Sequence, residues 1–426
     1  MLTLLKKGCI GMTLCLLLVF VSTLLSYDNY QSTLVYPPFS HCFGLHKVGK
    51  SHLFLILGTR VQFRNPQGLS TSKLEILDDP NNTNDDNELT VFGVNNGQNL
   101  VLYNLSLTTL GYIGGIDTFK NPHGIAANAK GFVYVADSEH SRIVCLKYTK
   151  EKGLVFLNIL KDDPNNPLKY PWDVKIASDG RVFVTDKALG MIRIWGKDGE
   201  VTASIRDERL INPTGLMLID KEDRWNYTGR NSLSVIVQDG KKILEYSFTG
   251  SFIREIGIPQ DVKTGMLAYG VYDRYASLFV TDTSQCCIHK WNKSGEYLCS
   301  FGKKGTGERE FDEPRGIAIW RRFGQVFIAE RAGAQYFWIG TDIISPRYEH
   351  DKDKRSVVRF MLTEPSLIEV FAQSLDKKIY SNNIMDAGNT SIFLPELSSK
   401  KIIITATPLY SSTKYFKKIV ELDISS

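Results

Sequence analysis

The sequence lacks the residue patterns on which several biochemical functions depend. It has seven cysteines in 426 residues, but no Cys-x-x-Cys pair and no spacing of Cys and His typical of a zinc site. The formal net charge is only +5, and Lys and Arg are scattered without a basic run, so we expect no nucleic-acid partner. The segment Gly302–Gly307 does not end in Gly-Lys-Ser/Thr, which excludes a phosphate-binding loop. We therefore expect no metal and no cofactor.

The most informative pattern present is a five-residue phrase that occurs six times, at intervals of 42 to 56 residues. We call it the repeat phrase. Most copies have Pro at the second position and Gly at the fourth, with a variable residue between them. The copies are Asn65-Pro66-Gln67-Gly68-Leu69, Asn121-Pro122-His123-Gly124-Ile125, Tyr170-Pro171-Trp172-Asp173-Val174, Asn212-Pro213-Thr214-Gly215-Leu216, Leu267-Ala268-Tyr269-Gly270-Val271 and Glu313-Pro314-Arg315-Gly316-Ile317. Repeats of this length are typical of propellers and solenoids.

Each repeat phrase is followed by short apolar runs separated by turn residues, which is the pattern of antiparallel strands. The second run of each unit ends on an acid or an amide. These residues are Asn95, Asp137, Asp186, Asp239, Asp282 and Glu330. We expect them to accept hydrogen bonds from turn amides rather than to act as acids or bases. Four strands per repeat predict the blades of a β-propeller.

Two stretches resemble the NHL-repeat family. The segment Phe301–Gly307, running on to the sixth phrase, is similar to that family's linker between blades, and Val133–Asp137 followed by Ser141-Arg142-Ile143 is similar to its second and third strands. The resemblance covers roughly residues 50–342 and implies an all-β, six-bladed NHL-type propeller. The run His52–Gly58 reads as an orphan strand, and we expect this N-terminal strand to complete the sixth blade and close the ring.

The two ends of the chain differ from the repeats. Residues 1–26 carry Lys6-Lys7 before an apolar run, which predicts either a cleaved signal peptide or an uncleaved membrane anchor. Both interpretations place the rest of the protein outside the cytoplasm, secreted, periplasmic or anchored, with residues 27–49 as a linker. After a second linker at 343–355, the alternating pattern of 356–426 predicts a small β-sandwich. It resembles the immunoglobulin-like modules of bacterial envelope proteins.

The variable position of the repeat phrase contains the candidate site. Because the first strand of each blade lines the central channel, these six side chains should meet at one mouth of that channel. They are Gln67, His123, Trp172, Thr214, Tyr269 and Arg315. Two aromatic side chains beside polar groups suit a sugar or a peptide, although the same residues could merely plug the channel.

The same column tests one enzyme. The amidating lyase that finishes peptide hormones is similar to an NHL propeller, and it holds zinc through His residues at this phrase position. A catalytic zinc site needs three protein ligands, and only His123 is a histidine in this column. The zinc site of that lyase is therefore absent.

These observations predict a non-enzymatic extracytoplasmic binding or scaffold protein. Its partner would be a protein, peptide or glycan of the cell envelope, and it would meet the membrane only through its N-terminal segment. Two alternatives stay open. One is a structural spacer of an envelope assembly, and the other is a metal-dependent hydrolase or lyase of the six-bladed propeller type.

Overall fold

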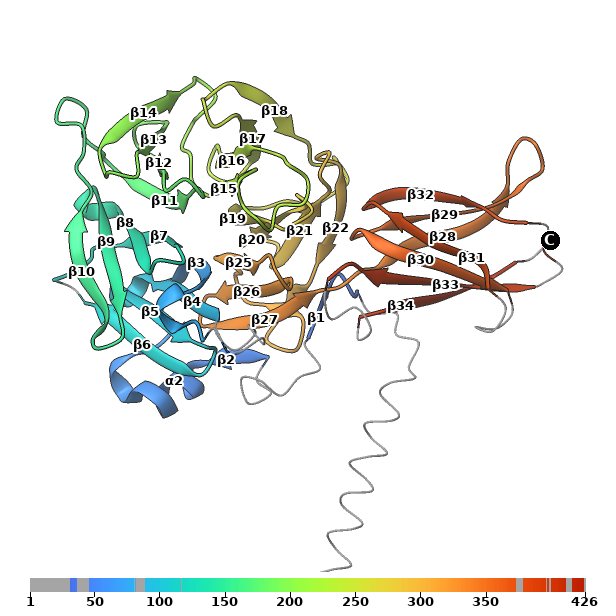
Figure 1. The fold of residues 1–426 in the computed structure, drawn as a ribbon, viewed down its shortest axis with the longest axis horizontal. Coiled ribbons are helices and arrows are strands. Elements are labelled where there is room, and N and C mark those ends of the chain that lie inside the picture. The colour runs from blue at the N-terminus through green and yellow to red at the C-terminus, as the bar shows by residue number, and fades with distance from the viewer. Residues whose placement is uncertain are drawn as a thin grey trace, which may run out of the picture.

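The computed structural model describes residues 31–36, 46–79, 81, 89–115, 117–372, 378–395, 397, 400–410 and 416–424. Almost all of its regular structure is β, in a ring of sheets and a smaller pair of sheets beside it (Figure 1). The signal peptide or anchor expected at 1–26 lies outside the described residues. Among the residues that are described, no helix is long and apolar enough to cross a membrane.

The first five repeat phrases each lead into a four-stranded antiparallel sheet, as the sequence predicts. We number these sheets one to five along the chain. Sheet one contains β3 (Pro66–Lys73), β4 (Leu89–Asn95), β5 (Leu100–Leu105) and β6 (Thr109–Gly114), and sheet two contains β7 (Pro122–Ala127), β8 (Phe132–Asp137), β9 (Arg142–Thr149) and β10 (Gly153–Ile159). Sheet three contains β11 (Pro171–Ile176), β12 (Val182–Asp186), β13 (Met191–Trp195) and β14 (Val201–Arg206), and sheet four contains β15 (Leu216–Ile219), β16 (Ser232–Val237), β17 (Lys242–Tyr246) and β18 (Phe252–Ile256). Sheet five contains β19 (Leu267–Tyr272), β20 (Leu278–Asp282), β21 (Cys287–Trp291) and β22 (Tyr297–Phe301).

Sheet six follows the last phrase and is built from β25 (Ile317–Trp320), β26 (Gln325–Glu330) and β27 (Gly333–Ile339). A short parallel pair, β23 (Lys303–Lys304) and β24 (Glu310–Phe311), lies in the linker before it. The first strand of each sheet contacts the first strand of the next, and β25 contacts β3. Figure 1 shows the sheets around a central opening, which is the arrangement of a β-propeller.

The prediction that an N-terminal strand occupies His52–Gly58 is wrong. The run His52–Gly58 belongs to the helix α2 (Lys50–Leu57) and the short 3-10 turn η2 (Gly58–Arg60). Its leucines favour a helix, and Nδ1 of His52 accepts the backbone N–H of Gly49 at the N-terminal end, 3.1 Å away. Three further 3-10 turns connect strands of the ring: η3 (Glu75–Leu77), η5 (Asn96–Gln98) and η6 (Ser138–His140).

The outer edge of sheet six is instead covered by strands from the segment expected to be a linker, 27–49. Here β1 (Leu34–Val35) pairs with one end of β27, where Leu34 faces Ile339, and β2 (Lys47–Gly49) pairs with the other end, where Lys47 faces Gln335. Both pairings are antiparallel. An N-terminal segment therefore does complete this sheet, but in two short pieces upstream of the predicted strand.

The apolar core lies between neighbouring sheets rather than in the channel. Phe92 of β4 and Val133 of β8 belong to one buried cluster, and Phe183 of β12 and Val235 of β16 belong to another. All four side chains are fully buried. Each sheet is thus stabilised by its two neighbours, as the alternation of apolar residues along the strands predicts.

The C-terminal part consists of two antiparallel sheets that share one apolar cluster. One contains β28 (Ile343–His350), β29 (Ser356–Leu362) and β32 (Gly388–Phe393). The other contains β30 (Ser366–Ala372), β31 (Lys378–Met385), β33 (Lys401–Pro408) and β34 (Lys418–Asp423). Val358, Ile368 and Ile404, which come from both sheets, are buried in this cluster. The stretch 343–355, expected to be a linker, contains β28, because its charged residues alternate with residues that face the sheet.

The recurring residues of the repeat phrase have two physical roles. In four copies the first residue has a left-handed backbone, with φ of 52° at Asn65 and Asn121 and 46° at Asn212, a conformation that Asn adopts more readily than most residues. The Gly provides space for the next sheet. A Cβ atom on Gly124 would lie 2.4 Å from Oδ1 of Asp173, and one on Gly316 would lie 2.1 Å from the carbonyl oxygen of Gln67.

The acids that end the second strands hold the turn before each phrase, as predicted, with one exception. Asp186 accepts the backbone N–H groups of Lys169 and Tyr170, and Asp282 accepts those of Gly265 and Met266. Asp239 is instead exposed and makes no such bond within the described residues. It faces a cavity described below.

The C-terminal sheets are fixed to sheet five by a buried ion pair. Lys290 of β21 donates a hydrogen bond to Glu364, and their side chains are 1% and 0% exposed. Asp273 belongs to the same cluster, and burial raises the pKa of both carboxyl groups. Beside it, the Tyr275 hydroxyl donates to the carbonyl oxygen of Leu409 over 3.2 Å.

We predict that Lys290→Met destabilises the protein by about 3–5 kcal/mol, because it leaves Glu364 buried without its cation. The double variant Lys290→Met/Glu364→Gln should recover a large part of that loss. Denaturant unfolding measures both. Lys293→Met is the matched control, since Lys293 forms an exposed pair with Asp386 and its loss should cost less than about 1 kcal/mol. Equal effects at the two lysines would contradict the role given to the buried pair.

Candidate functional site

All six residues of the predicted column line one cavity of about 190 Å³ at the start of the first strands. Gln67, His123, Trp172 and Tyr269 lie in β3, β7, β11 and β19. Thr214 and Arg315 come just before β15 and β25. Lys187 and Asp239 line the same cavity. The structure thus brings together every side chain that the column predicts, although their role in binding is a separate question.

The backbone of the column is held by small polar side chains that the sequence analysis did not single out. Ser138 donates a hydrogen bond to the carbonyl oxygen of Pro171 (2.6 Å), Thr185 to that of Thr214 (2.7 Å) and Thr281 to that of Arg315 (2.7 Å). Each donor comes from the preceding sheet. The signal that could have revealed them is a Ser, Thr or Asn directly beside four of the six strand-ending residues, at Asn95, Asp137, Asp186 and Asp282.

His123 is fixed as a neutral imidazole. Its Nδ1 lies 2.9 Å from both the Asn121 carbonyl oxygen and Oγ of Ser138. Because the Ser138 hydroxyl already donates to Pro171, Nδ1 must carry the proton and donate to both oxygens. Burial, together with the positive charges of Arg315 and Lys187, lowers the pKa of His123 to about 4. No described residue bonds to Nε2, which is left as an acceptor.

Trp172 and Lys187 form an aromatic and cationic wall beside this imidazole. The ring centroids of His123 and Trp172 are 3.9 Å apart with planes 30° apart, a stacked arrangement. Nζ of Lys187 lies 5.0 Å from the indole centroid and 3.0 Å from Oδ1 of Asp239. The hydrogen bond from Lys187 lowers the pKa of Asp239. Asp239 therefore balances a cation at the cavity, which explains why it does not hold a turn.

The opposite wall combines a phenol with an incompletely paired guanidinium. The Tyr269 hydroxyl donates to Oε1 of Gln67 over 3.2 Å, and burial raises its pKa well above the usual value. Nη2 of Arg315 lies 3.0 Å from Oε2 of Glu313. Nε of Arg315 is buried without a hydrogen-bond partner among the described residues. A guanidinium with donors to spare suits a carboxylate or a carbonyl oxygen that gains negative charge.

The donor set of this cavity does not fit a catalytic metal. It holds one imidazole and one carboxylate, and the latter is already paired with Lys187. A catalytic zinc ion requires three protein ligands. In the described ranges there is no group of three His, Cys, Asp or Glu side chains placed to hold a metal ion.

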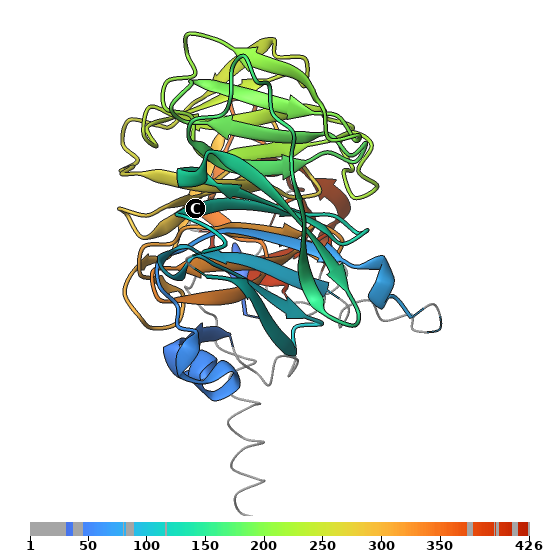
Figure 2. The ribbon, with the colours of Figure 1, turned by 90° about the vertical axis from the view of Figure 1, so that its left-hand side faces the viewer.

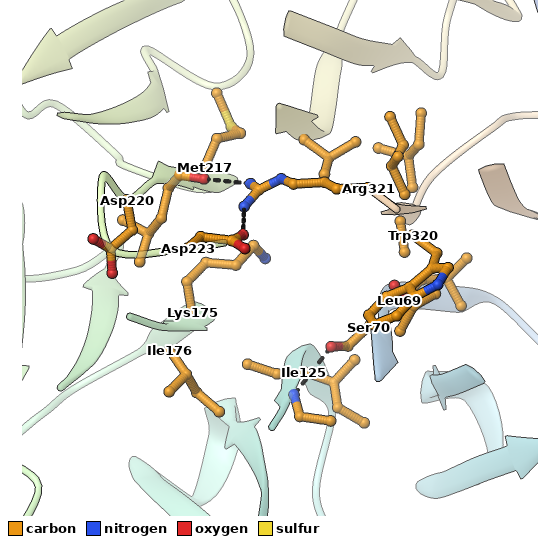
Figure 3. A pocket seen from close by; sticks show the side chains of 18 of the residues that line it. Leu69, Ser70, Ile125, Lys175, Ile176, Met217, Asp220, Asp223, Trp320 and Arg321 are labelled. Atoms are coloured by element: carbon orange, nitrogen blue, oxygen red, sulfur yellow. Dashed lines mark hydrogen bonds and ion pairs between the residues drawn. The ribbon is translucent and has the colours of Figure 1, made fainter. Parts of the chain in front are cut away.

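A second cavity, of about 240 Å³, lies toward the other end of the first strands (Figure 3). Its charged side chains form ion pairs with one another and hydrogen bonds to backbone groups. Lys175 lies 2.8 Å from Oδ2 of Asp173, and Arg321 bonds to Asp223 and donates to the carbonyl oxygen of Leu218 (2.8 Å). The sequence analysis missed this cavity because its residues lie outside the column, at positions that follow it in each sheet. The charged side chains of this second cavity join neighbouring sheets. The column cavity instead contains a donor, Nε of Arg315, and an acceptor, Nε2 of His123, that have no partner among the described residues.

Comparison with known proteins supports the fold. The NHL repeat family matches residues 119–146, which contain the second repeat phrase. No curated protein matches the chain. Among solved structures, a streptogramin B lyase is 14% identical and has a TM-score of 0.44, and the alignment covers 68% of this chain and 96% of that one. A virginiamycin B lyase from Staphylococcus aureus is 16% identical, with a TM-score of 0.42 and coverage of 59% and 77%. A gluconolactonase from Xanthomonas campestris is 14% identical, with a TM-score of 0.47 and coverage of 72% and 97%.

The family match confirms an NHL repeat, which is consistent with the ring of four-stranded sheets, and the similar structures correct one expectation. The protein was expected not to be an enzyme, but the similar structures are those of enzymes, lyases and a gluconolactonase. The likeness concerns the fold. What this chain does must be argued from its own cavity.

We predict that His123 titrates near pH 4 in the folded protein, against 6.5 for an unperturbed histidine. Folding therefore favours its neutral form, and the resulting stability is complete above pH 6.5 and is lost as the pH falls toward 4. The shift corresponds to about 3 kcal/mol. NMR of the imidazole nitrogens should show a proton on Nδ1 and a midpoint near 4. A midpoint near 6.5, or unchanged acid stability in His123→Gln, would contradict this account.

Proposed function

We propose that this propeller is an enzyme of the lyase or hydrolase type and that the column cavity is its active site. The observation that carries the proposal is the pairing of an acceptor and a cation in one small cavity. His123 offers an unprotonated Nε2, and the buried Nε of Arg315 has no hydrogen-bond partner among the described residues. A base beside a group that stabilises negative charge is the minimum for removing a proton from a carbon or from water.

The roles of the residues follow from their bonds. Nε2 of His123 accepts the proton. Nδ1–H remains hydrogen-bonded to the oxygens of Asn121 and Ser138, and these bonds fix the orientation of the ring. Arg315 donates to the substrate oxygen on which charge develops, and Trp172 stacks on a flat part of the substrate. In a lyase the proton comes from carbon next to a carbonyl group and the leaving group departs. In a hydrolase it comes from the attacking water.

The low pKa of His123 makes it a weak base in the free protein, and the substrate is expected to change that. Arg315 and Lys187 are among the causes of the low pKa. An anionic or polarised oxygen bound at Arg315 offsets part of this positive charge and so raises the pKa of His123, although burial still lowers it. The site therefore favours substrates with a carboxylate, ester or lactone group.

The architecture around the site is part of the proposal. We infer that sheets one to six are the blades of a closed six-bladed propeller, supported by the contact between β25 and β3 and by the close approach of Gly316 to Gln67. The N-terminal apolar run supports a place outside the cytoplasm. The two C-terminal sheets and their common cluster support an immunoglobulin-like module.

Purified protein should cleave at least one member of a panel of sugar lactones, carboxylate esters and cyclic depsipeptides, including a gluconolactone and quinupristin. We predict that His123→Gln lowers kcat/KM by about 100-fold or more and that Arg315→Lys lowers it by about 10-fold or more. In the wild type, kcat/KM should fall as the pH drops through about 4, where His123 gains a proton.

The matched control is His350→Gln, the same substitution at an exposed histidine of the C-terminal sheets. Its activity should equal that of the wild type. Full activity in His123→Gln, or equal losses in the two glutamine variants, would contradict the assignment of the base. No turnover across the panel would contradict the reaction class.

A further inference from the structure

Large apolar side chains are exposed on one flank of the propeller, formed by α2, β6 and β10. In α2, Phe54 is 55% exposed, Leu55 79% and Ile56 59%. The other exposed members are Tyr112 of β6 and Phe156, Leu157 and Ile159 of β10. These seven residues, which we call the apolar flank, are nearly half of the fifteen large apolar side chains exposed among the described residues. A cluster of this kind marks an interaction surface more often than scattered exposed residues do.

The three elements are neighbours in space. Helix α2 contacts β6, and β6 contacts β10. Figure 1 labels all three on the same side of the ring, and Figure 2 turns that side toward the viewer. The strand β10 is the outermost of sheet two, so in the described part of the chain no strand pairs with its second edge.

The fold itself does not require α2 to be so apolar. Of its eight residues only Leu53 is buried, against the cluster that includes Val61 and Leu100. Phe54 and Leu55 are largely exposed, and Ile56 is exposed but also lines an apolar cavity beside Leu53. Among the described residues nothing covers these side chains, and exposed apolar groups that lie together suit an interaction surface.

The charges around the apolar flank identify the chemistry of that partner. No Asp or Glu occurs from Asn29 to Leu74, a stretch that includes α2. Lys50 and Arg60, at the two ends of the helix region, are exposed. Lys150 and Lys152, in the turn before β10, are exposed as well, with Glu151 as the acid between them. Apolar side chains within a basic rim fit a bilayer surface that carries anionic lipids.

We propose that the apolar flank docks on the surface of an anionic bilayer, with Phe54, Leu55 and Ile56 inserted at the boundary between headgroups and acyl chains. This contact is separate from the N-terminal segment, and it holds the propeller itself against the membrane. It is also independent of the reaction proposed for the column cavity.

The test measures depth in the membrane at single positions of the full chain. Leu55→Trp and Ile211→Trp are prepared, since Ile211 is 50% exposed at a site outside the apolar flank. Each protein is incorporated into phosphatidylcholine vesicles with 30% phosphatidylglycerol, with and without brominated acyl chains, and the wild-type fluorescence is subtracted. Brominated chains should quench the new indole at position 55 at least twofold more than that at 211.

Two further arms make the proposal falsifiable. In vesicles of phosphatidylcholine alone, quenching at position 55 should fall by half or more, because the basic rim loses its counter-charge. Leu55→Asp/Ile56→Asp should lower vesicle binding, while Phe393→Asp, at an exposed residue of the C-terminal sheets, should not. Equal quenching at positions 55 and 211 overturns the proposal. A fluorescence change of the indole at position 55 that depends on protein concentration and occurs without lipid also overturns it, because that result would indicate contact with a second copy of the chain.

Discussion

The structure depends on how closely the first strands of neighbouring sheets approach each other at the repeat phrase. At Gly124 and Gly316 the neighbouring sheet occupies the space that a Cβ atom would need. The left-handed backbone of Asn65, Asn121 and Asn212 then turns the chain into each first strand. Five of the six phrases have Gly at this position, and Asp173 stands there in the third. The variable residues of all six line one cavity. The cavity follows from the packing of the backbone.

The ring has two mouths with different chemistry. At one mouth, the charged side chains form ion pairs, between Lys175 and Asp173 and between Arg321 and Asp223. Arg321 also donates to a backbone carbonyl group, so this end joins sheets. At the other, the backbone of the column is already held by hydroxyl groups such as those of Thr185 and Thr281. The backbone of the column is thus held without its side chains, although some of these, such as Tyr269 and Gln67, also bond across sheets. Such a division allows the column to vary without loss of the fold.

Sequence reasoning predicted the parts that depend on repetition. The sheets, the meeting of the column and the role of Asp137, Asp186 and Asp282 all follow from a pattern that occurs several times. Sequence reasoning failed for residues whose role occurs in only one place and has no counterpart in the other repeats. The run after Gly49 was read as a strand because it is apolar, but its leucines and its end residues favour the helix α2. Asp239 was expected to accept turn amides like the other strand-ending acids, but it forms an ion pair with Lys187 of sheet three at the cavity. The neutral state of His123 depends on Ser138 and on burial, which no local pattern contains.

The buried pair of Lys290 and Glu364 has a consequence for how this chain can be divided. The boundary expected from the sequence, between residues 355 and 356, separates β28 from β29, which are paired along most of their length. A cut just before β28 would leave Lys290 without its carboxylate on the surface of sheet five. The C-terminal sheets therefore cover a charged group of sheet five and are not simply detachable from it. A recombinant propeller that ends near residue 342 would lack part of its own structure.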